Sequence, residues 1–390
     1  MRTAFIVQRY GLEILGGSEY HCRLIAERMA GHHEVEVLTT CARDYITWAN
    51  EYSEGSERIN GVTVRRFANA RERDIDAFNK YSDWIFSNPH THDDEMSWLE
   101  QQGPWCPALL EYLATHAPSY DAVIFFTYLY APTVLGLQIA PERSILAPTA
   151  HNEPAIHLEI YREMFRRPKA IAFNTEVERA FLKRTFDIRV VAEETVGCGV
   201  DLLAGRSTPA HPRRNGLPEG PFLLYGGRID AGKGCDQLLD FFGAYKDEGG
   251  PATLVLMGAK LMALPDVPWV RYAGLLSEAD RLRALEAATI VVVPSPFESL
   301  SLLALEGMAV GTPVLCNARA DVLVEHCRRS NAGLFYASRE EFAECVHLLL
   351  ADRSLSERMG ANGKAYVTAN YSWNVIMAKY DRLMAALPKP

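Results

Sequence analysis

Short apolar runs recur along the first half of the chain, and helical patterns separate them. The runs that read as strands are residues 3–7, 34–38, 62–67, 122–126, 144–148, 170–173 and 189–192. Several lack in/out alternation, which is typical of strands covered on both faces. Helical periodicity occupies residues 18–29 and 175–185 between them. This alternation predicts an α/β fold with a mostly parallel, doubly wound sheet.

The pattern pauses at residues 203–220, which are rich in Pro, Gly, Arg and Asn and read as a linker. It then restarts with runs at residues 222–225, 253–257, 269–272, 290–293, 313–315 and 333–335. We therefore expect two Rossmann-like domains, residues 1–202 and 221–370. Ligands of such sheets bind beyond the carboxyl ends of the strands, and two sheets facing each other would form a cleft.

Two stretches of the first domain depart from this pattern. Residues 41–61 and 68–107 are polar, rich in aromatics and weakly periodic. They read as long loops and irregular helices inserted on the first sheet. Long loops in compact domains are often functional, so substrate specificity is expected here.

Composition narrows the functional class. The 390 residues carry a formal net charge of −9, which argues against a nucleic-acid binder. The eight cysteines form no Cys-x-x-Cys pair and no zinc-like spacing, so reduced, buried thiols are expected. The apolar run after Met1 stops at Gln8, too early for a signal-peptide core, and no run approaches the roughly 20 residues that span a bilayer. The sequence predicts a cytoplasmic protein that is soluble or at most peripheral to a membrane.

Two glutamates eight residues apart are the most informative chemical feature. A helix is expected to begin near Ser299, with Glu298 just before it and Glu306 on it. Eight helical residues span about 12 Å. The backbone N–H groups expected to be free for a phosphate in the first turn are those of Leu300, Ser301 and Leu302. The alternative is a glutamate that favours the helix dipole and an ordinary surface glutamate.

A Gly-rich turn after residues 222–225 adds two cations. Gly227 precedes Arg228, and Lys233 follows five residues later. A guanidinium fork and a point charge at this spacing suit a diphosphate. The turn matches neither the P-loop nor the Gly-x-Gly-x-x-Gly fingerprint. The alternative is a flexible surface loop with solvated charges.

The first domain contributes two weaker features. Gly16 and Gly17 precede Ser18 at a helix start, where a ligand can approach backbone N–H groups closely. Ser18 is an N-cap in the alternative interpretation. His151 follows the strand expected at residues 144–148 and would lie at a carboxyl edge. A lone histidine is more often structural.

Together these motifs resemble the family 4 glycosyltransferases of GT-B fold. The resemblance rests on the Gly-Gly-Ser loop, His151, the Gly-Gly-Arg…Lys-Gly turn, the Glu-x7-Glu segment and the Gly311–Val314 stretch (Gly-Thr-Pro-Val). It implies transfer of a sugar with retention of anomeric configuration, without a cofactor or an essential metal. The implied donor is a UDP- or GDP-sugar, and the implied acceptor is a carbohydrate or a lipid-linked saccharide. No nucleic-acid partner is expected.

The resemblance also implies roles for single residues. His151 and Glu298 border the donor sugar, Arg228 and Lys233 bind the diphosphate, and Glu306 binds the ribose. Residues 271–275, with Tyr272 and Gly274, resemble the strand end where backbone groups hold the base. Residues 371–390 resemble a C-terminal helix that crosses back to the first domain.

Two departures from the family pattern are visible. Family members often carry glycine where Ser299 or Ser301 stands, and residues 317–321 lack the usual Gly-rich turn. Because of these two departures, the sequence does not predict how the site fits the donor sugar or which sugar it binds.

Other functions remain as alternatives. These are an inverting enzyme with His151 as base, a GT-B-fold sugar-nucleotide epimerase or hydrolase, and a non-catalytic sugar-nucleotide binder. A nicotinamide dehydrogenase lacks its phosphate fingerprint after Val7. Asp74 and Asp76 form an Asp-x-Asp sequence like the metal-binding motif of metal-dependent glycosyltransferases. We interpret it instead as part of a charged, solvent-exposed surface.

Membrane contact is a further alternative. A basic cluster formed by Arg162, Arg166, Arg167 and Lys169 lies beside Tyr161 and Phe165. It reads either as a docking site for a lipid-linked acceptor or as a solvated helix face.

Overall fold

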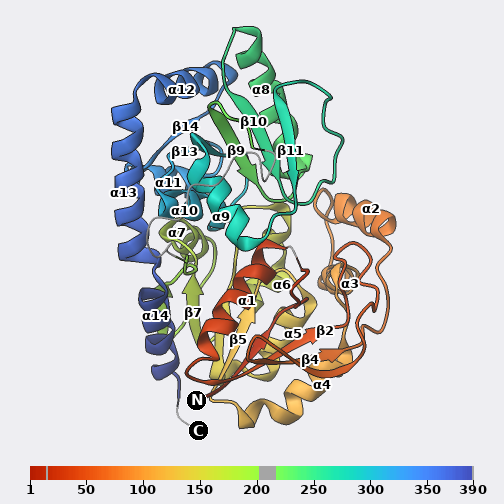
Figure 1. Ribbon diagram of the computed structural model, residues 1–390. Helices are drawn as coiled ribbons and strands as arrows, with labels where there is room; N and C mark the ends of the chain where they lie inside the picture. Colours follow the sequence, from red (N-terminus) through yellow and green to blue (C-terminus); the bar gives the residue numbers. More distant parts are fainter. Residues whose placement is uncertain (15, 202–216, 389–390) are drawn as a thin grey trace. The chain divides into compact units, whose positions relative to one another are not determined.

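The computed structural model describes residues 1–14, 16–201 and 217–388. The chain forms two compact units, each a parallel α/β domain (Figure 1). Unit 1 comprises Met1–Cys198 together with the chain from Ile376 onward, and unit 2 comprises Gly199–Val375. Residues 203–216 of the expected linker lie outside the described residues.

Unit 1 is built on an eight-stranded sheet with the order β3-β4-β2-β1-β5-β6-β7-β8. The strands are β1 (Arg2–Ile6), β2 (Glu34–Thr40), β3 (Gly55–Ile59), β4 (Val62–Phe67), β5 (Ala122–Phe126), β6 (Ser144–Ala147), β7 (Ala170–Phe173) and β8 (Ala192–Thr195). The pairing is parallel throughout except between β3 and β4. The runs at 62–67, 122–126 and 170–173 were predicted with the observed bounds.

The helices of unit 1 are α1 (Gly17–Met29), α2 (Ile75–Ile85), α3 (His92–Gln102), α4 (Pro107–His116), α5 (Ala131–Ile139), α6 (Glu159–Met164), α7 (Glu176–Thr185) and α14 (Trp373–Ala385). In α14, Ile376, Tyr380 and Leu383 are buried, and Lys379 Nζ donates to the Thr195 carbonyl of β8 at 2.7 Å. The helix therefore completes unit 1.

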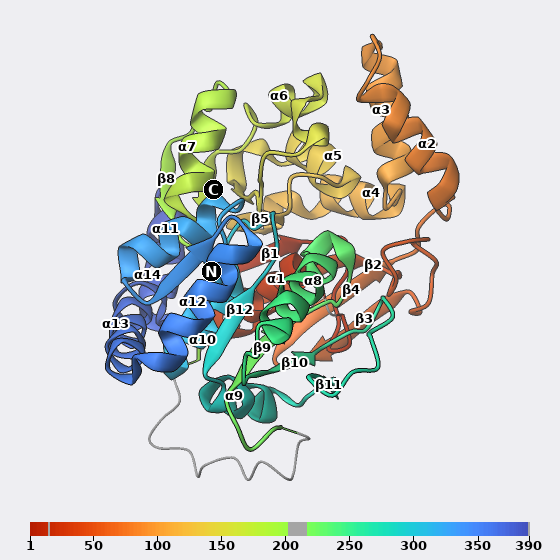
Figure 2. The same cartoon turned by 90° about the horizontal axis from the view of Figure 1, so that it is seen from above.

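One prediction about the elements of unit 1 was wrong, and another was incomplete. The strand expected at residues 189–192 lies instead at β8, whose residues are only half-buried, so no apolar run marks it. The inserted stretches contain regular elements: β3 and the helices α2 and α3, which Figure 2 shows beside α4. β3 escaped detection because its residues are polar and almost all exposed.

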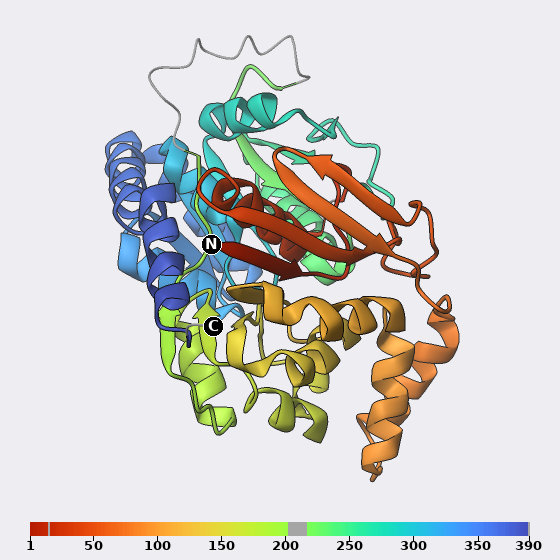
Figure 3. The same ribbon diagram turned by 90° about the horizontal axis from the view of Figure 1, so that it is seen from below.

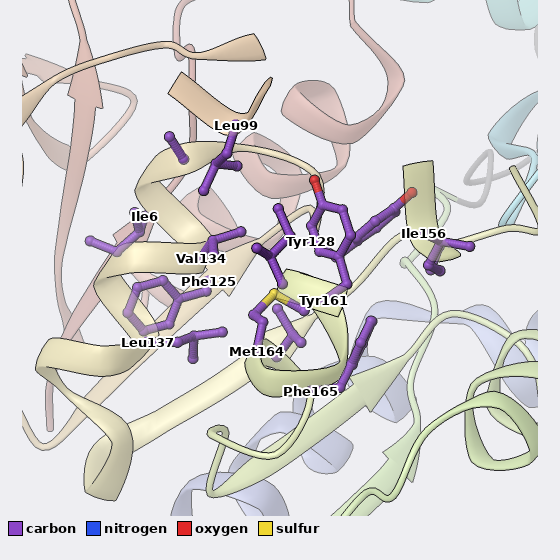
Figure 4. Close-up of a cluster of buried hydrophobic side chains, with 14 of the residues drawn as sticks. Ile6, Leu99, Phe125, Tyr128, Val134, Leu137, Ile156, Tyr161, Met164 and Phe165 are labelled. Atoms are coloured by element: carbon purple, nitrogen blue, oxygen red, sulfur yellow. The ribbon is translucent and has the colours of Figure 1, made fainter. Parts of the chain in front are cut away.

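The inserted helices are anchored in the core of unit 1. Leu99 of α3 joins a buried cluster with Phe125 of β5 and Tyr161 of α6, seen in Figure 4. Glu95 of α3 is buried and accepts hydrogen bonds from the backbone N–H groups of Glu159 and Ile160, at 2.9 and 2.8 Å. The insertion is thus fixed by apolar packing and by a carboxylate that satisfies the start of α6.

Unit 2 has a six-stranded parallel sheet with the order β11-β10-β9-β12-β13-β14. Its strands are β9 (Phe222–Gly226), β10 (Thr253–Met257), β11 (Val270–Gly274), β12 (Ile290–Val293), β13 (Val314–Asn317) and β14 (Gly333–Tyr336). Its helices are α8 (Cys235–Asp247), α9 (Glu278–Ala287), α10 (Leu302–Val310), α11 (Asp321–Ser330), α12 (Arg339–Ala351) and α13 (Arg353–Tyr371). The core strands β9, β10 and β12 are almost entirely buried, as continuous apolar runs predict.

Candidate functional site

The strand order of unit 2 places its charged motifs at one edge. From β9 the chain runs to β10 on one side, while β12 is the neighbour of β9 on the other side. Open α/β sheets bind ligands at the carboxyl ends of strands at such a switch point. The Arg228–Lys233 turn follows β9, and Glu298 follows β12. Two motifs some 65 residues apart in sequence therefore meet.

The turn after β9 is held by its own side chains. Asp230 accepts a hydrogen bond from the Lys233 backbone N–H at 2.8 Å, and its other oxygen lies 3.1 Å from Arg228 Nε. Gly234 has φ +72°, and a Cβ added there would lie 2.5 Å from the Pro294 carbonyl oxygen. Glycine is needed at this position because the turn packs directly against the backbone that follows β12.

Lys233 and Glu298 form an ion pair with 2.8 Å between Nζ and Oε1. The lysine side chain is 31% exposed and the glutamate side chain 15%. Both groups are accessible enough to meet a ligand and close enough to orient each other. A bound phosphate would compete with Glu298 for the ammonium group.

The segment before α10 differs from the prediction. Helix α10 begins at Leu302, three residues later than expected, and Ser301 precedes it with φ +66°. The free N–H groups of the first helical turn are therefore those of Leu302, Leu303 and Ala304. Leu300 and Ser301 lie before the helix, so their assignment as first-turn donors was wrong. Glu298 to Glu306 is also not one continuous stretch of helix.

Residues distant in sequence hold this segment. His326 is buried, and its Nε2 lies 2.9 Å from the Leu300 carbonyl while its Nδ1 lies 3.1 Å from Tyr366 Oη. The carbonyl requires an Nε2–H donor, so Nδ1 accepts from the tyrosine. Burial lowers the pKa of His326 to about 4, which keeps this ring neutral. Asn317 Nδ2 donates to the Pro294 carbonyl at 2.9 Å.

Glu306 is buried and bonded to Arg281 of α9. Burial raises the pKa of the Glu306 carboxyl, and the guanidinium of Arg281 opposes that shift. Sequence reasoning missed Arg281, Asn317 and His326. Each lies 23 residues or more from the partner named above, so no local motif contains both members of a pair.

The end of β11 closes this edge of unit 2. Tyr272 is 43% exposed, and its hydroxyl donates to the Gly258 carbonyl at 2.8 Å. The Gly258 N–H donates to the Gly274 carbonyl at 2.9 Å. Lys260 Nζ lies 5.4 Å from the centre of the Tyr272 ring. The segment therefore offers a ring, a cation and ordered backbone groups beside the switch point.

In unit 1 the Gly-Gly-Ser loop starts α1 after the first strand. Gly16 is the N-cap, so the interpretation of Ser18 as N-cap was wrong. The Ser18 hydroxyl donates to Glu19 at 2.9 Å, and Arg9 holds the other oxygen of that carboxylate through Nε at 3.0 Å. Gly17 has no atom within 4 Å of an added Cβ, so its backbone is open to a ligand.

His151 lies just beyond β6, at the carboxyl edge of the unit 1 sheet. Its Nε2 is 3.7 Å from a Glu153 oxygen, and the other Glu153 oxygen accepts from Tyr128 Oη at 2.6 Å. The loop is braced from below by buried Glu178, which accepts from the Ala150 and Asn174 N–H groups, each at 2.5 Å. Burial raises the pKa of Glu178 to about 8.

The basic cluster and the Asp-x-Asp have structural partners. Tyr161 and Phe165 are buried, Arg162 pairs with Glu159 at 3.1 Å, and Lys169 pairs with Glu142 at 2.7 Å. Asp74 caps α2 by accepting from the Ala77 N–H at 3.0 Å.

The described residues contain neither a candidate metal site nor a candidate membrane span. They contain no group of three or more His, Cys, Asp or Glu side chains placed to hold a metal ion. They also include no helix that combines the length and the apolar content needed to cross a bilayer.

The comparisons with known proteins agree with this architecture. Residues 207–366 match the family model described as glycosyl transferases group 1. A D-inositol 3-phosphate glycosyltransferase of Jonesia denitrificans is 26% identical over 273 residues, which are 62% of this chain and 63% of that protein. The alignments span between 53% and 63% of the first three curated relatives.

Solved structures match the whole described fold. A sucrose-phosphate synthase from Thermosynechococcus elongatus superposes with a TM-score of 0.72 and 18% identity over 99% of both chains. Anabaena HepE, solved in complex with UDP and glucose, has the same TM-score and 15% identity over 99% of this chain and 100% of that one. The similarity to these structures establishes the fold.

Proposed function

We propose that this chain, which has a GT-B fold and matches the glycosyl transferases group 1 model over residues 207–366, is a family 4 glycosyltransferase. In this proposal it transfers a hexose-type sugar from a nucleotide-diphosphate sugar to a hydroxyl group. The acceptor is a carbohydrate or a lipid-linked saccharide, and the anomeric configuration is retained. The observation that carries this proposal is the Lys233–Glu298 pair at the switch point of unit 2.

The proposed chemistry is a front-face displacement. The bond between the anomeric carbon and the phosphate oxygen breaks, and its electron pair leaves with the nucleoside diphosphate. Arg228, Lys233 and the first N–H groups of α10 neutralise the negative charge that develops there. The acceptor oxygen bonds to the carbon from the same side, and its proton passes to the departing phosphate oxygen. No metal or cofactor is required in this scheme.

The remaining residues position the donor. Glu298 contacts the sugar, Glu306 accepts from the ribose hydroxyls, and the end of β11 with Tyr272 and Gly274 receives the base. Arg281 keeps the buried Glu306 carboxyl oriented. Gly17, Ser18, Gly227 and His151 complete the donor contacts, with His151 orienting the sugar. An inverting enzyme would instead use His151 as the general base.

The nucleotide is identified first. Purified protein is heated with UDP, GDP and ADP, and the melting temperature is recorded. A bound ligand raises stability by RT ln(1 + [L]/Kd), so about 2.7 kcal/mol is gained at a hundredfold excess over Kd. We expect UDP or GDP to stabilise unit 2. The preferred nucleotide then limits which nucleotide sugars need to be tested as donors. HepE was solved with UDP, whereas a mannosyltransferase relative is named for GDP-mannose.

The product then decides the reaction. With the chosen donor and a panel of sugar acceptors, NMR of the anomeric proton is expected to show the donor's configuration in the product, also in EDTA. An inverted anomer would assign His151 as base, and loss of activity in EDTA would contradict metal independence. A free or isomerised sugar formed without acceptor would identify a hydrolase or an epimerase. Nucleotide binding with no turnover would identify a binder.

Location is proposed on the same grounds. The protein acts in the cytoplasm, where nucleotide sugars are made, with peripheral membrane contact as the variant for a lipid-linked acceptor. Liposome co-sedimentation separates the two. Binding that is unchanged when Arg162, Arg166, Arg167 and Lys169 are replaced by alanine would remove the basic cluster from that contact.

A further inference from the structure

Unit 1 contains a pocket of about 190 Å³ formed entirely by the inserted segments. Its walls come from the loop after β2, the segment between β4 and α2, and the end of α3. The lining residues are Trp48, Arg71, Glu72, Arg73, Asp74, Ala77, Glu100, Gln101, Gly103 and Trp105. Figure 3 shows α2 and α3 projecting from the rest of unit 1, beside α4. We propose that this pocket binds one uncharged pyranose ring of the acceptor, an inference that rests on the proposed function.

The walls of the pocket are fixed before any ligand arrives. The Arg73 N–H donates to the Thr47 carbonyl at 2.6 Å, and the Ala70 N–H donates to the Trp105 carbonyl at 2.8 Å. Trp48 is buried, and its indole N–H donates to the Gln102 carbonyl at 2.8 Å. Three segments are thus tied together, so little conformational entropy is lost when a ligand enters.

The charges of the lining select an uncharged occupant. Three carboxylates (Glu72, Asp74 and Glu100) outnumber two guanidinium groups, so a phosphate or carboxylate group would meet net negative charge. Arg71 is paired with Glu100 at 2.9 Å. The Arg73 guanidinium is occupied by the carbonyls of Tyr45, Ile46 and Gln102 and by the Gln102 side chain. The Arg73 guanidinium is thus fully engaged, and the Arg71 guanidinium lies beside the Glu100 carboxylate.

The polar groups that remain suit hydroxyls. Glu72 is exposed, and within the described part of the chain its carboxylate has no hydrogen-bond or ion-pair partner. Gln101 adds an amide that both donates and accepts. Trp105, which is half-buried, supplies aromatic surface for the C–H face of a sugar ring, while the buried Trp48 forms the floor beneath Arg73. Carboxylate, amide and indole in one small pocket match a ring that carries hydroxyls on its rim and C–H groups on its faces.

The size of the pocket limits the ligand. Its 190 Å³ is below the roughly 300–1,000 Å³ that is typical of sites for drug-sized ligands. One pyranose ring is therefore the unit that this pocket selects.

The test uses the methyl α-glycosides of glucose, mannose, galactose and N-acetylglucosamine as probes. Their binding to the full chain is measured by saturation-transfer NMR and by tryptophan fluorescence. Trp105→Ala removes aromatic surface, and Ala77→Trp fills the pocket from an exposed position on α2. Trp84→Ala is the matched control, because Trp84 lies on α2, is 39% exposed and does not line the pocket.

We expect at least one glycoside to bind, with binding weakened about tenfold or more in Ala77→Trp and Trp105→Ala and unchanged in Trp84→Ala. The proposal is overturned if no glycoside binds, if Ala77→Trp binds as wild type does, or if inorganic phosphate displaces the sugar from the pocket. Thermal stabilisation by UDP or GDP is measured on the same variants. If sugar binding is lost while nucleotide binding stays intact, the pocket proposal fails but the proposed sugar transfer is unaffected. If a sugar binds but no nucleotide does, the proposed sugar transfer is contradicted and the pocket proposal stands.

Discussion

The carboxyl edges of the two sheets differ in how their most buried acidic groups are held. In unit 2 the acidic groups at this edge face cations, as Lys233 with Glu298 and Arg281 with Glu306. In unit 1 Glu19 also pairs with Arg9, but the best-buried carboxyl at this edge, Glu178, accepts from the Ala150 and Asn174 N–H groups and has no cation partner among the described residues. The first arrangement can be rearranged by a ligand that brings its own charge, while the second fixes loops in place. In the proposed function, unit 2 would therefore carry the chemistry and unit 1 would position the substrate.

Glu178 gives the strongest test of the positioning role. Burial raises its pKa from 4.5 to about 8, so the folded protein holds a proton that the unfolded chain releases. The stability contributed by this proton is fully present below pH 4.5 and is lost as pH rises towards 8, on the order of 5 kcal/mol over that window. Unfolding in urea at several pH values is the measurement.

Glu178→Gln is expected to flatten this pH slope. Glu176→Gln is the control, since Glu176 is an exposed neighbour on the same helix. A wild-type slope in Glu178→Gln would show that the carboxyl titrates normally in the folded protein.

Lys233→Ala tests the chemical role of unit 2. If Lys233 stabilises the leaving phosphate as proposed, its removal is expected to lower kcat by about 10²–10³. Initial rates with the donor found in the nucleotide screen measure it. The control is Arg353→Ala on α13, whose side chain is 91% exposed. His151→Ala should cost less, because that side chain orients the sugar without meeting the phosphate charge; a larger loss in His151→Ala would reverse the comparison.

Gly234→Ala tests the close packing that joins the two motifs of unit 2. An added Cβ faces both a left-handed backbone and the Pro294 carbonyl at 2.5 Å. We expect a loss of about 3 kcal/mol, more than the strain of about 1–2 kcal/mol alone. Gly249→Ala is the matched control, because Gly249 has φ +87° and open space around it. Equal losses, measured by denaturant unfolding, would remove the packing argument.

Ser301→Gly is the smallest expected effect, and its sign is opposite. Ser301 holds φ +66° with a side chain, so glycine should stabilise unit 2 by about 1 kcal/mol. Ser299 does not have a positive φ, so Ser299→Gly should destabilise by about 0.5 kcal/mol through the unfolded state. A thermal shift in the same direction for both would show that backbone strain at Ser301 is not the cause.

The same pair of serines shows what the sequence could reveal. The sequence shows that serine replaces the family's glycine at 299 or 301. Only the structure shows that Ser301 is the one with the positive φ that glycine would favour. Buried runs such as β10 and β12 were predicted with their observed bounds because burial on both faces leaves an unbroken apolar signal. The polar edge strand β3 leaves none. The Arg228–Lys233 turn could be recognised in the sequence because its residues are contiguous. The contacts of Arg281 and His326 could not, because their partners are distant in sequence and meet them only in the folded chain.

The division of the chain has a consequence for how the protein is made. Unit 1 buries Ile376, Tyr380 and Leu383, which follow all of unit 2 in sequence. Because synthesis runs from the amino end, the ribosome must deliver unit 2 before the last helix of unit 1 exists. The first 198 residues therefore wait, with an uncovered apolar face beside β8, until α14 emerges. A chain that ends before residue 376 would leave exposed the apolar surface of unit 1 that Ile376, Tyr380 and Leu383 cover.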